Sequence, residues 1–487
     1  MASTGVEPLF FSRGVGYASN PLNIDYSLKL KTKINTTETR TLDLQSRLVR
    51  ICIDTMLFWS GQPWMLALAL LPGLVCSRIV LEWNDPVLIS APTLAAPAGP
   101  GAPEFFYNFD HSHFWGPELL GTPSSFAFSA DEGRHWTGAK GPDVPSVAWP
   151  LLPTDGGGFR SLGGGLSFDM GGWNMTWPRL YTLDPGGGNF STADAPGGVG
   201  PSHTVRFHGV PFPGANVTHP SIHPGSRNYG VARTAAGGYV LATCILWNGL
   251  QPRAGPPHEG EFTPFSVVAF TSDDGYDWSY SSVIANWSTS DMYWGPNEND
   301  VSLLSDNSTL LAVLRMDGDS ACASQSYRYY GASYSTDGGL SWSAPAPMDG
   351  AGCVRPKLKL LDSGPLLLTG GRLCVEGAQG VYLWVNEDGM GGVGGGDPRV
   401  EWQRHSISYQ HNRLWAARGG DPRYLFNESV NASDGWGTLS YTSIMPTGPD
   451  SAAIAYQQYG AYGPNSTVHT WPGPNTNFAI QVKVKVV

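Results

Sequence analysis

SADEGRHW (Ser129–Trp136), TSDDGYDW (Thr271–Trp278) and STDGGLSW (Ser335–Trp342) are three copies of one pattern, Ser/Thr-x-Asp-x-Gly-x-x-Trp. A fourth segment, NEDGMGG from Asn386, keeps the Asp and a Gly but breaks the spacing. Alternating apolar runs precede the second, third and fourth segments. Asp and Ser side chains bond to nearby backbone groups, and Gly adopts positive φ at little cost. The pattern therefore predicts tight hairpin turns at strand ends, each with its Trp folded back over the turn.

The composition agrees with a chain of many short strands. Among 487 residues there are 62 Gly and 39 Pro, about one residue in five, whereas about 12% is usual. Charged residues make up only 14%, and aromatic residues 12% with 18 Trp. These values exclude a coiled coil, a helical repeat array and a charged disordered chain. The net charge of −11 argues against a nucleic-acid partner.

Residues 1–77 are predicted to be a leader. The apolar run Met65–Val75 would span about 16 Å as a helix, half of a bilayer core, which fits the apolar region of a signal peptide. Met56 would begin a leader of ordinary length, with residues 1–55 as an upstream extension. A signal anchor is the alternative. After removal of the leader we expect a secreted protein with no stable membrane span.

Other sequence features are typical of the secretory pathway. Four cysteines follow the leader, and four cysteines allow three disulfide pairings. No C-x-x-C motif and no zinc-like His/Cys spacing is present, so neither a metal site nor a cofactor is predicted. Eight Asn-x-Ser/Thr sequons suit a glycoprotein: Asn174, Asn189, Asn216, Asn286, Asn307, Asn427, Asn431 and Asn465.

The repeated turn pattern resembles the Asp box, or BNR repeat, of the sialidase superfamily. The resemblance implies an all-β fold over residues 78–487: a six-bladed β-propeller of four-stranded antiparallel blades. We expect the strand Arg78–Trp83 to join the last blade, beside the alternating strand FAIQVKVKVV, so that both ends of the domain close the ring. The expected blades cover residues 101–150, 151–217, 218–290, 291–346, 347–410 and 436–487.

The resemblance also implies a site on the propeller axis. Sialidases grip a substrate carboxylate with three arginines, pair a Tyr nucleophile with a Glu, and use an Asp as acid/base. The stretch PNENDVSLLSDNSTLLAVLR resembles the family segment that carries the Glu and the second arginine, which are here Glu298 and Arg315. A carboxylate beside a phenol can accept its proton during attack. The alternative is a loop carboxylate and a surface charge at a strand end.

Three further residues are carried over from the same resemblance. Arg372 ends LLLTGGR and matches the third arginine, because guanidinium binds a carboxylate through a planar fork. Tyr441 in LSYTSIMP matches the nucleophile, although a packed sheet tyrosine is the alternative. Arg355, in CVRP, is not at a standard position and is predicted to point into the axial cavity.

The first blade departs from the family pattern. Trp115 stands in HFWGPELL where the first arginine is expected, and no arginine occurs between Arg78 and Arg134. The loop before the first turn segment also lacks the usual Asp, which leaves Asp110 and His113 as nearby substitutes. Two functions remain open: a secreted, retaining exo-glycosidase acting on acidic, sialic-acid-type glycans, or a catalytically inactive glycan-binding propeller in which Trp115 stacks on a sugar. A propeller that serves only protein contacts is a third possibility.

Overall fold

A computed structural model describes residues 79–90, the strands between 106 and 222, and residues 229–246, 265–286, 296–316, 329–371, 380–392, 402–426, 442–459 and 475–487, with gaps at 276, 349 and 353. The chain separates into two compact units, Met1–Cys76 and Ser77–Val487. The predicted leader lies outside the described residues. Within the described part, no helix is long and apolar enough to cross a membrane.

In the described part of the second unit, strands dominate and form six sheets. In the first sheet the strands lie side by side in the same order as in the sequence: β3 (Phe106–Tyr107), β4 (Phe114–Pro117), β5 (Phe126–Ser129) and β6 (Thr137–Ala139). The second consists of β7 (Leu151–Pro153), β8 (Gly158–Ser161), β11 (Leu180–Leu183) and β12 (Phe190–Ala193). All neighbouring strands in these two sheets are antiparallel.

The third sheet is larger than expected. Its blade is formed by β15 (Tyr229–Arg233), β16 (Tyr239–Leu246), β17 (Phe265–Ser272) and β18 (Asp277–Ala285). Four short strands extend it: β9 (Leu166–Asp169), β10 (Gly172–Met175), β13 (Val205–His208) and β14 (Ser221–Ile222). β13 pairs with β18 in parallel, so part of the chain expected in the second blade covers the outer edge of the third. The blade itself has the four antiparallel strands that were predicted, and the short strands are added at its edges.

The fourth and fifth sheets have four antiparallel strands each, as predicted. The fourth contains β19 (Asn299–Leu303), β20 (Leu310–Leu314), β21 (Gly331–Ser335) and β22 (Ala346–Pro347). The fifth contains β23 (Val354–Leu360), β24 (Leu366–Gly371), β25 (Val381–Asn386) and β26 (Trp402–Ser406).

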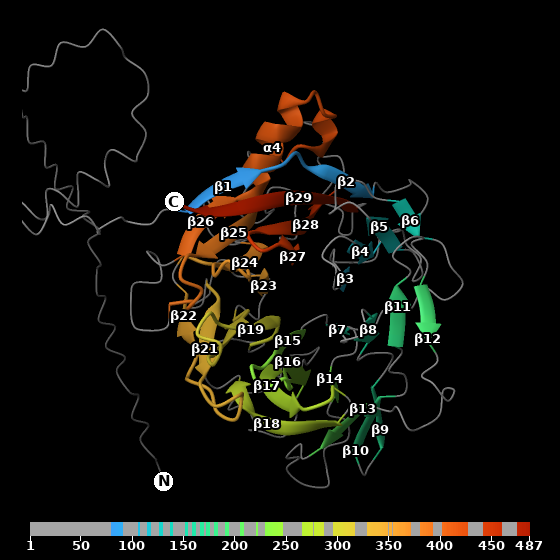
Figure 1. The fold of residues 1–487 in the computed structure, drawn as a ribbon, viewed down its shortest axis with the longest axis vertical. Coiled ribbons are helices and arrows are strands. Elements are labelled where there is room, and N and C mark those ends of the chain that lie inside the picture. Colours follow the sequence, from blue (N-terminus) through green and yellow to red (C-terminus); the bar gives the residue numbers. More distant parts are fainter. Residues whose placement is uncertain are drawn as a thin grey trace, which may run out of the picture. The chain divides into compact units, whose positions relative to one another are not determined.

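The sixth sheet joins the two ends of the unit. It contains β27 (Thr442–Gly448), β28 (Ser451–Tyr459), β29 (Asn475–Val486) and β1 (Ile79–Trp83), while β2 (Val87–Ser90) also pairs with β29. In Figure 1 the blue β1 runs beside the red β29. An ion pair of 2.5 Å between Lys485 Nζ and Glu82 reinforces this pairing. The prediction that Arg78–Trp83 adds a strand to the last blade is confirmed, and the edge of β29 is covered.

The first strands of the third to sixth blades lie next to one another. β15 contacts β19, β19 contacts β23, and β23 contacts β27. Six successive sheets, innermost strands that meet and a last sheet shared by both ends of the unit define an all-β, six-bladed β-propeller. The starts of β19 and β23 lie close together, because Arg355 N–H donates to Glu298 Oε2 and Leu358 N–H to Asp300 Oδ2.

The turn segments join the third and fourth strands of their blades. In Ser335–Trp342, the Ser335 hydroxyl donates to Asp337 and accepts from Gly339 N–H at 2.8 Å, while Asp337 accepts from Ser341 N–H at 2.9 Å. In the segment from Asn386, the amide oxygen of Asn386 accepts from Gly391 N–H at 2.8 Å. The hydrogen-bonded turn predicted from the sequence therefore forms even where the spacing breaks.

The second turn segment is held by different residues from those of the aligned pattern. Ser272 and Asp274, rather than Thr271 and Asp273, make the turn contacts, with Ser272 Oγ accepting from Gly275 N–H at 2.8 Å. The buried Trp278 folds back as predicted and donates to the Gly275 carbonyl at 3.1 Å. The turn is one residue shorter between its Ser and Gly than the turn at Ser335.

A helix that the sequence analysis did not predict follows the fifth blade. α4 (Ile407–Ala417) begins at Ser406, whose hydroxyl accepts from Tyr409 N–H at 3.1 Å, and the short 3-10 helix η3 (Pro422–Tyr424) follows it. Ile407, His411 and Trp415, four residues apart, are buried against the fifth and sixth blades. The capping Ser and the spacing of buried residues were readable signals.

Candidate active site

Glu298 and Arg315 lie opposite each other where β19 begins and β20 ends. The ladder of these strands pairs Asn299 with Leu314, and the next pair along the chain is Glu298 with Arg315. Arg315 N–H donates to the Glu298 carbonyl at 2.6 Å, and Arg315 Nη1 lies 2.9 Å from Glu298 Oε2. The side chains of Glu298 and Arg315 are 9% and 19% exposed, so the ion pair is shielded but reaches solvent. Two residues predicted from one sequence motif are thus in contact.

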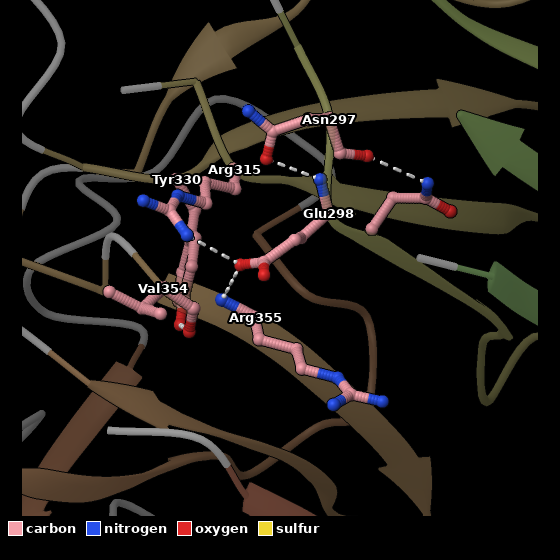
Figure 2. Close-up of polar contacts among 7 residues, drawn as sticks. Asn297, Glu298, Arg315, Tyr330, Val354 and Arg355 are labelled. Carbon is pink, nitrogen blue, oxygen red and sulfur yellow. Dashed lines mark hydrogen bonds and ion pairs between the residues drawn. The ribbon is translucent and has the colours of Figure 1, made fainter. Parts of the chain in front are cut away.

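Arg355 approaches Glu298 with its backbone. Its N–H donates to Glu298 Oε2 at 2.8 Å, the oxygen that also contacts Arg315. The residue sits in an irregular stretch of β23, between the paired residues Val354 and Lys357, with a left-handed φ of 33°. Figure 2 shows its guanidinium directed away from the Glu298 carboxylate, and the residue is only 2% exposed. Its predicted role in binding a substrate carboxylate stays a prediction.

A second carboxylate extends this contact between the fourth and fifth blades. Asp300 Oδ2 accepts from Leu358 N–H at 2.8 Å. Because side chains two residues apart on a strand share a face, Glu298 and Asp300 both face β23. Burial raises the pKa of Asp300, and the positive charge of Lys357 opposes this shift. The carboxylates of Glu298, just before β19, and Asp300, in β19, therefore accept hydrogen bonds from two backbone N–H groups of the fifth blade.

A buried tyrosine lies behind the same stretch of β23. Tyr330 is fully buried, and its hydroxyl donates to the Val354 carbonyl. Its ring packs edge-on against Trp384 with a centroid distance of 6.1 Å. The Val354 carbonyl and the Arg355 N–H belong to one peptide group, so Tyr330 and Glu298 bind the two sides of that group (Figure 2).

The remaining predicted site residues are not described in full. Tyr441 and Arg372 lie outside the described residues. Their chain neighbours are described: Thr442 opens β27, and Gly371 ends β24 opposite Val354. Trp115 lies in β4, where the backbone pairs it with Phe106 and Phe128, and its side chain is outside the described part. Asp110 and His113 also fall outside it.

The described residues contain no cluster of His, Cys, Asp and Glu that could hold a metal ion. Cys244 is a buried free thiol whose pKa is raised by burial, with a smaller contribution from the charge of Glu298. Cys322, Cys353 and Cys374 lie outside the described residues.

Sequence reasoning missed two residues of this region, Asp300 and Tyr330. Asp300 was readable, because PNEND places a second carboxylate two positions after Glu298 on a strand. Tyr330 gave no such signal, since its role depends on a contact with a strand that begins 24 residues later.

No protein-family model and no curated protein matches the chain. Several solved structures are similar in fold. A protein of unknown function from Dyadobacter fermentans has 14% identity and a TM-score of 0.46, and the match covers 83% of this chain and 99% of that one. The α-L-arabinofuranosidase Arb93A from Fusarium graminearum has 12% identity, a TM-score of 0.45 and coverages of 82% and 97%. The Hadza microbial sialidase Hz136 has 11% identity, a TM-score of 0.43 and coverages of 79% and 65%. At these values the likenesses carry no argument about activity.

Proposed function

We propose that the protein is a secreted, sialidase-like exo-glycosidase that releases an acidic sugar of the sialic-acid type from glycans. One observation carries the proposal: Glu298 and Arg315, assigned to one site from a sequence motif, lie 2.9 Å apart at the start of an innermost strand. Glycans or glycoconjugates would be its substrates, and neither a metal nor a cofactor enters the proposal.

In this proposal Tyr441 is the nucleophile and Glu298 its base. The phenolic oxygen forms a bond to the anomeric carbon while the glycosidic bond breaks, and the phenolic proton moves to Glu298. Both described contacts of the Glu298 carboxylate use Oε2, so Oε1 is the oxygen assigned to the Tyr441 phenol. The leaving oxygen takes its proton from an acid, for which Asp110 and His113 are the first-blade candidates.

The arginines would bind the carboxylate of the substrate. Arg315 is placed by its pair with Glu298 and keeps 19% of its side chain exposed. Arg372 directly follows Gly371, whose backbone partner Val354 is the chain neighbour of Arg355. A charge-assisted contact of this kind contributes about 1.5–3 kcal/mol, so each arginine should matter for affinity.

Turnover of a fluorogenic sialic-acid-type glycoside tests the proposal. Tyr441→Phe should abolish release, because the ring remains and only the attacking oxygen is lost. Tyr409→Phe is the matched control, since Tyr409 is 52% exposed on α4 and far along the chain from the proposed nucleophile. Equal release by the wild type and Tyr441→Phe would refute the assignment of the nucleophile.

A second function, a glycan-binding propeller without catalysis, is favoured by one observation: Trp115 replaces the first arginine and the first blade lacks the usual Asp. The lack of an acid/base typically costs a factor of about 10² to 10⁴ in rate. A glycan array separates the two functions. Binding of acidic glycans without turnover supports the second, and turnover of any acidic glycan rejects it.

A further inference from the structure

We infer that Tyr330 is a positioning residue for Glu298 and acts on it through the peptide group between Val354 and Arg355. The inference deepens the proposed function, on which the catalytic meaning of Glu298 rests. The Tyr330 hydroxyl donates to the carbonyl of this peptide group, and the N–H of the same group donates to Glu298 Oε2 at 2.8 Å. Tyr330 would therefore influence a carboxylate that it does not touch.

The peptide group is held in an unusual conformation that needs support from both sides. Arg355 has a φ of 33° in an irregular stretch of β23. A non-glycine residue with positive φ costs on the order of 1 kcal/mol and persists only where its surroundings fix it. Tyr330 binds one side of the peptide group and Glu298 the other. Hydrogen bonds arranged in series also polarise one another, so the hydroxyl makes the N–H a stronger donor.

The surroundings of Tyr330 show that its ring has a dedicated place. The residue is fully buried, and Tyr330 N–H donates to the Ala351 carbonyl at 3.0 Å. A Cβ added at Gly352 would overlap the Tyr330 ring, and one added at Gly370 would overlap its hydroxyl. The ring therefore occupies a slot that only glycine leaves open, and the hydroxyl can reach the Val354 carbonyl.

The same blade offers a matched tyrosine. Tyr334 also donates its hydroxyl to a backbone carbonyl of the fifth blade, that of Gly391, at 2.8 Å. This contact belongs to the turn after β25 and touches neither β23 nor Glu298. Tyr330→Phe and Tyr334→Phe thus each remove one tyrosine–carbonyl hydrogen bond between the same two blades, but only the first is linked to Glu298.

A double-mutant cycle on the full chain tests the inference. Melting temperatures are measured at one scan rate for the wild type, Tyr330→Phe, Glu298→Ala, which removes the acceptor of the Arg355 N–H, and the double variant. If Tyr330 and Glu298 are coupled, Tyr330→Phe should lower the melting temperature about half as much, or less, once Glu298 is replaced. Tyr334→Phe should have the same effect in both backgrounds. Equal effects of Tyr330→Phe in both backgrounds would overturn the inference.

Steady-state kinetics give kcat and KM separately, and a general loss of stability does not change kcat alone. For an active wild type, Tyr330→Phe should lower kcat roughly 3- to 30-fold with little change in KM. Tyr334→Phe should leave both unchanged. A wild type without turnover refutes the proposed function but not the coupling, which the melting cycle decides alone.

Discussion

The two sides of β19 meet their neighbours by opposite means. Toward the third blade the approach is backbone to backbone, because a Cβ at Gly230 of β15 would overlap Val301 N and Asp300 Cα. Toward the fifth blade the contact is polar, since the carboxylates of Glu298 and Asp300 accept N–H groups of β23. The comparison shows how one innermost strand can pack tightly on one side and still hold charged groups, available for chemistry, on the other.

The backbone contact should be the more sensitive of the two. Gly230→Ala should destabilise the protein by about 3 kcal/mol, because the added Cβ meets backbone atoms that cannot move aside. Urea unfolding followed by tryptophan fluorescence measures the loss.

Gly419→Ala is the control for that measurement. Gly419 has a φ of 70° and open space around its Cβ position, so alanine adds left-handed strain of about 1 kcal/mol and no overlap. Equal losses for the two variants would contradict the close contact between β15 and β19.

The contact between Asp300 and the Leu358 N–H should tolerate loss of the carboxylate charge better than loss of the acceptor oxygen. Asp300→Ala leaves the buried Leu358 N–H without its partner and should cost about 1–3 kcal/mol, whereas Asp300→Asn keeps an acceptor oxygen and should cost less than about 1 kcal/mol. The same unfolding experiment measures both. Equal losses for Asn and Ala would show that the charge, rather than the acceptor, holds the two blades together.

The pH dependence of the Asp300 contribution has a definite sign. Burial raises the pKa of Asp300 above its ordinary 3.8, so the folded state holds this proton more tightly than the unfolded state. The stabilisation of the folded state by Asp300 is therefore fully present at pH values below the ordinary pKa of 3.8, and it is lost as the pH rises through the raised pKa of the folded state. Asp300→Asn should remove this part of the pH profile.

A third buried polar group should respond to pH in the opposite direction. Burial lowers the pKa of His411 to about 3 from an ordinary 6.5, and its Nδ1 lies 2.7 Å from the Tyr456 hydroxyl. The unfolded chain takes up this proton below about 6.5 while the folded protein does not, so stability falls as the pH drops from 6.5 toward 3. His411→Gln should be less stable at neutral pH but should show a shallower decline in melting temperature. An unchanged decline would place the acid sensitivity elsewhere.

Much of the fold was predictable because its signals are local. The Asp, Ser and Gly residues of the turn segments predict hairpins. The alternating apolar and polar residues of β29 predict a strand, which pairs with a neighbour on each side. The β9–β10 hairpin was not predictable, because β10 pairs with β13 and β13 with β18, which lies about 70 residues further along the chain. The one-residue shift at Ser272 was hidden because Asp273 and Asp274 adjoin and either could fill the pattern.

The site divides in the same way. Glu298 and Arg315 could be paired from sequence, since a hairpin between them fixes their register. The contact of Glu298 with the Arg355 backbone could not, because it depends on an irregular stretch of β23 in the next blade. The contact of Tyr330 depends on the same stretch and is visible only in the folded protein, whereas Asp300 could have been read from its place two residues after Glu298.

In the proposed mechanism Tyr441 attacks the anomeric carbon of an acidic sugar with Glu298 as its base. Rapid quenching during turnover of a sialic-acid-type glycoside with a good leaving group, followed by mass spectrometry of proteolytic fragments, tests this directly. We expect a glycosyl adduct on the fragment that contains Tyr441, and no adduct on this fragment in Tyr441→Phe. An adduct on another residue, or undiminished turnover by Tyr441→Phe, would contradict the assignment of Tyr441 as the nucleophile.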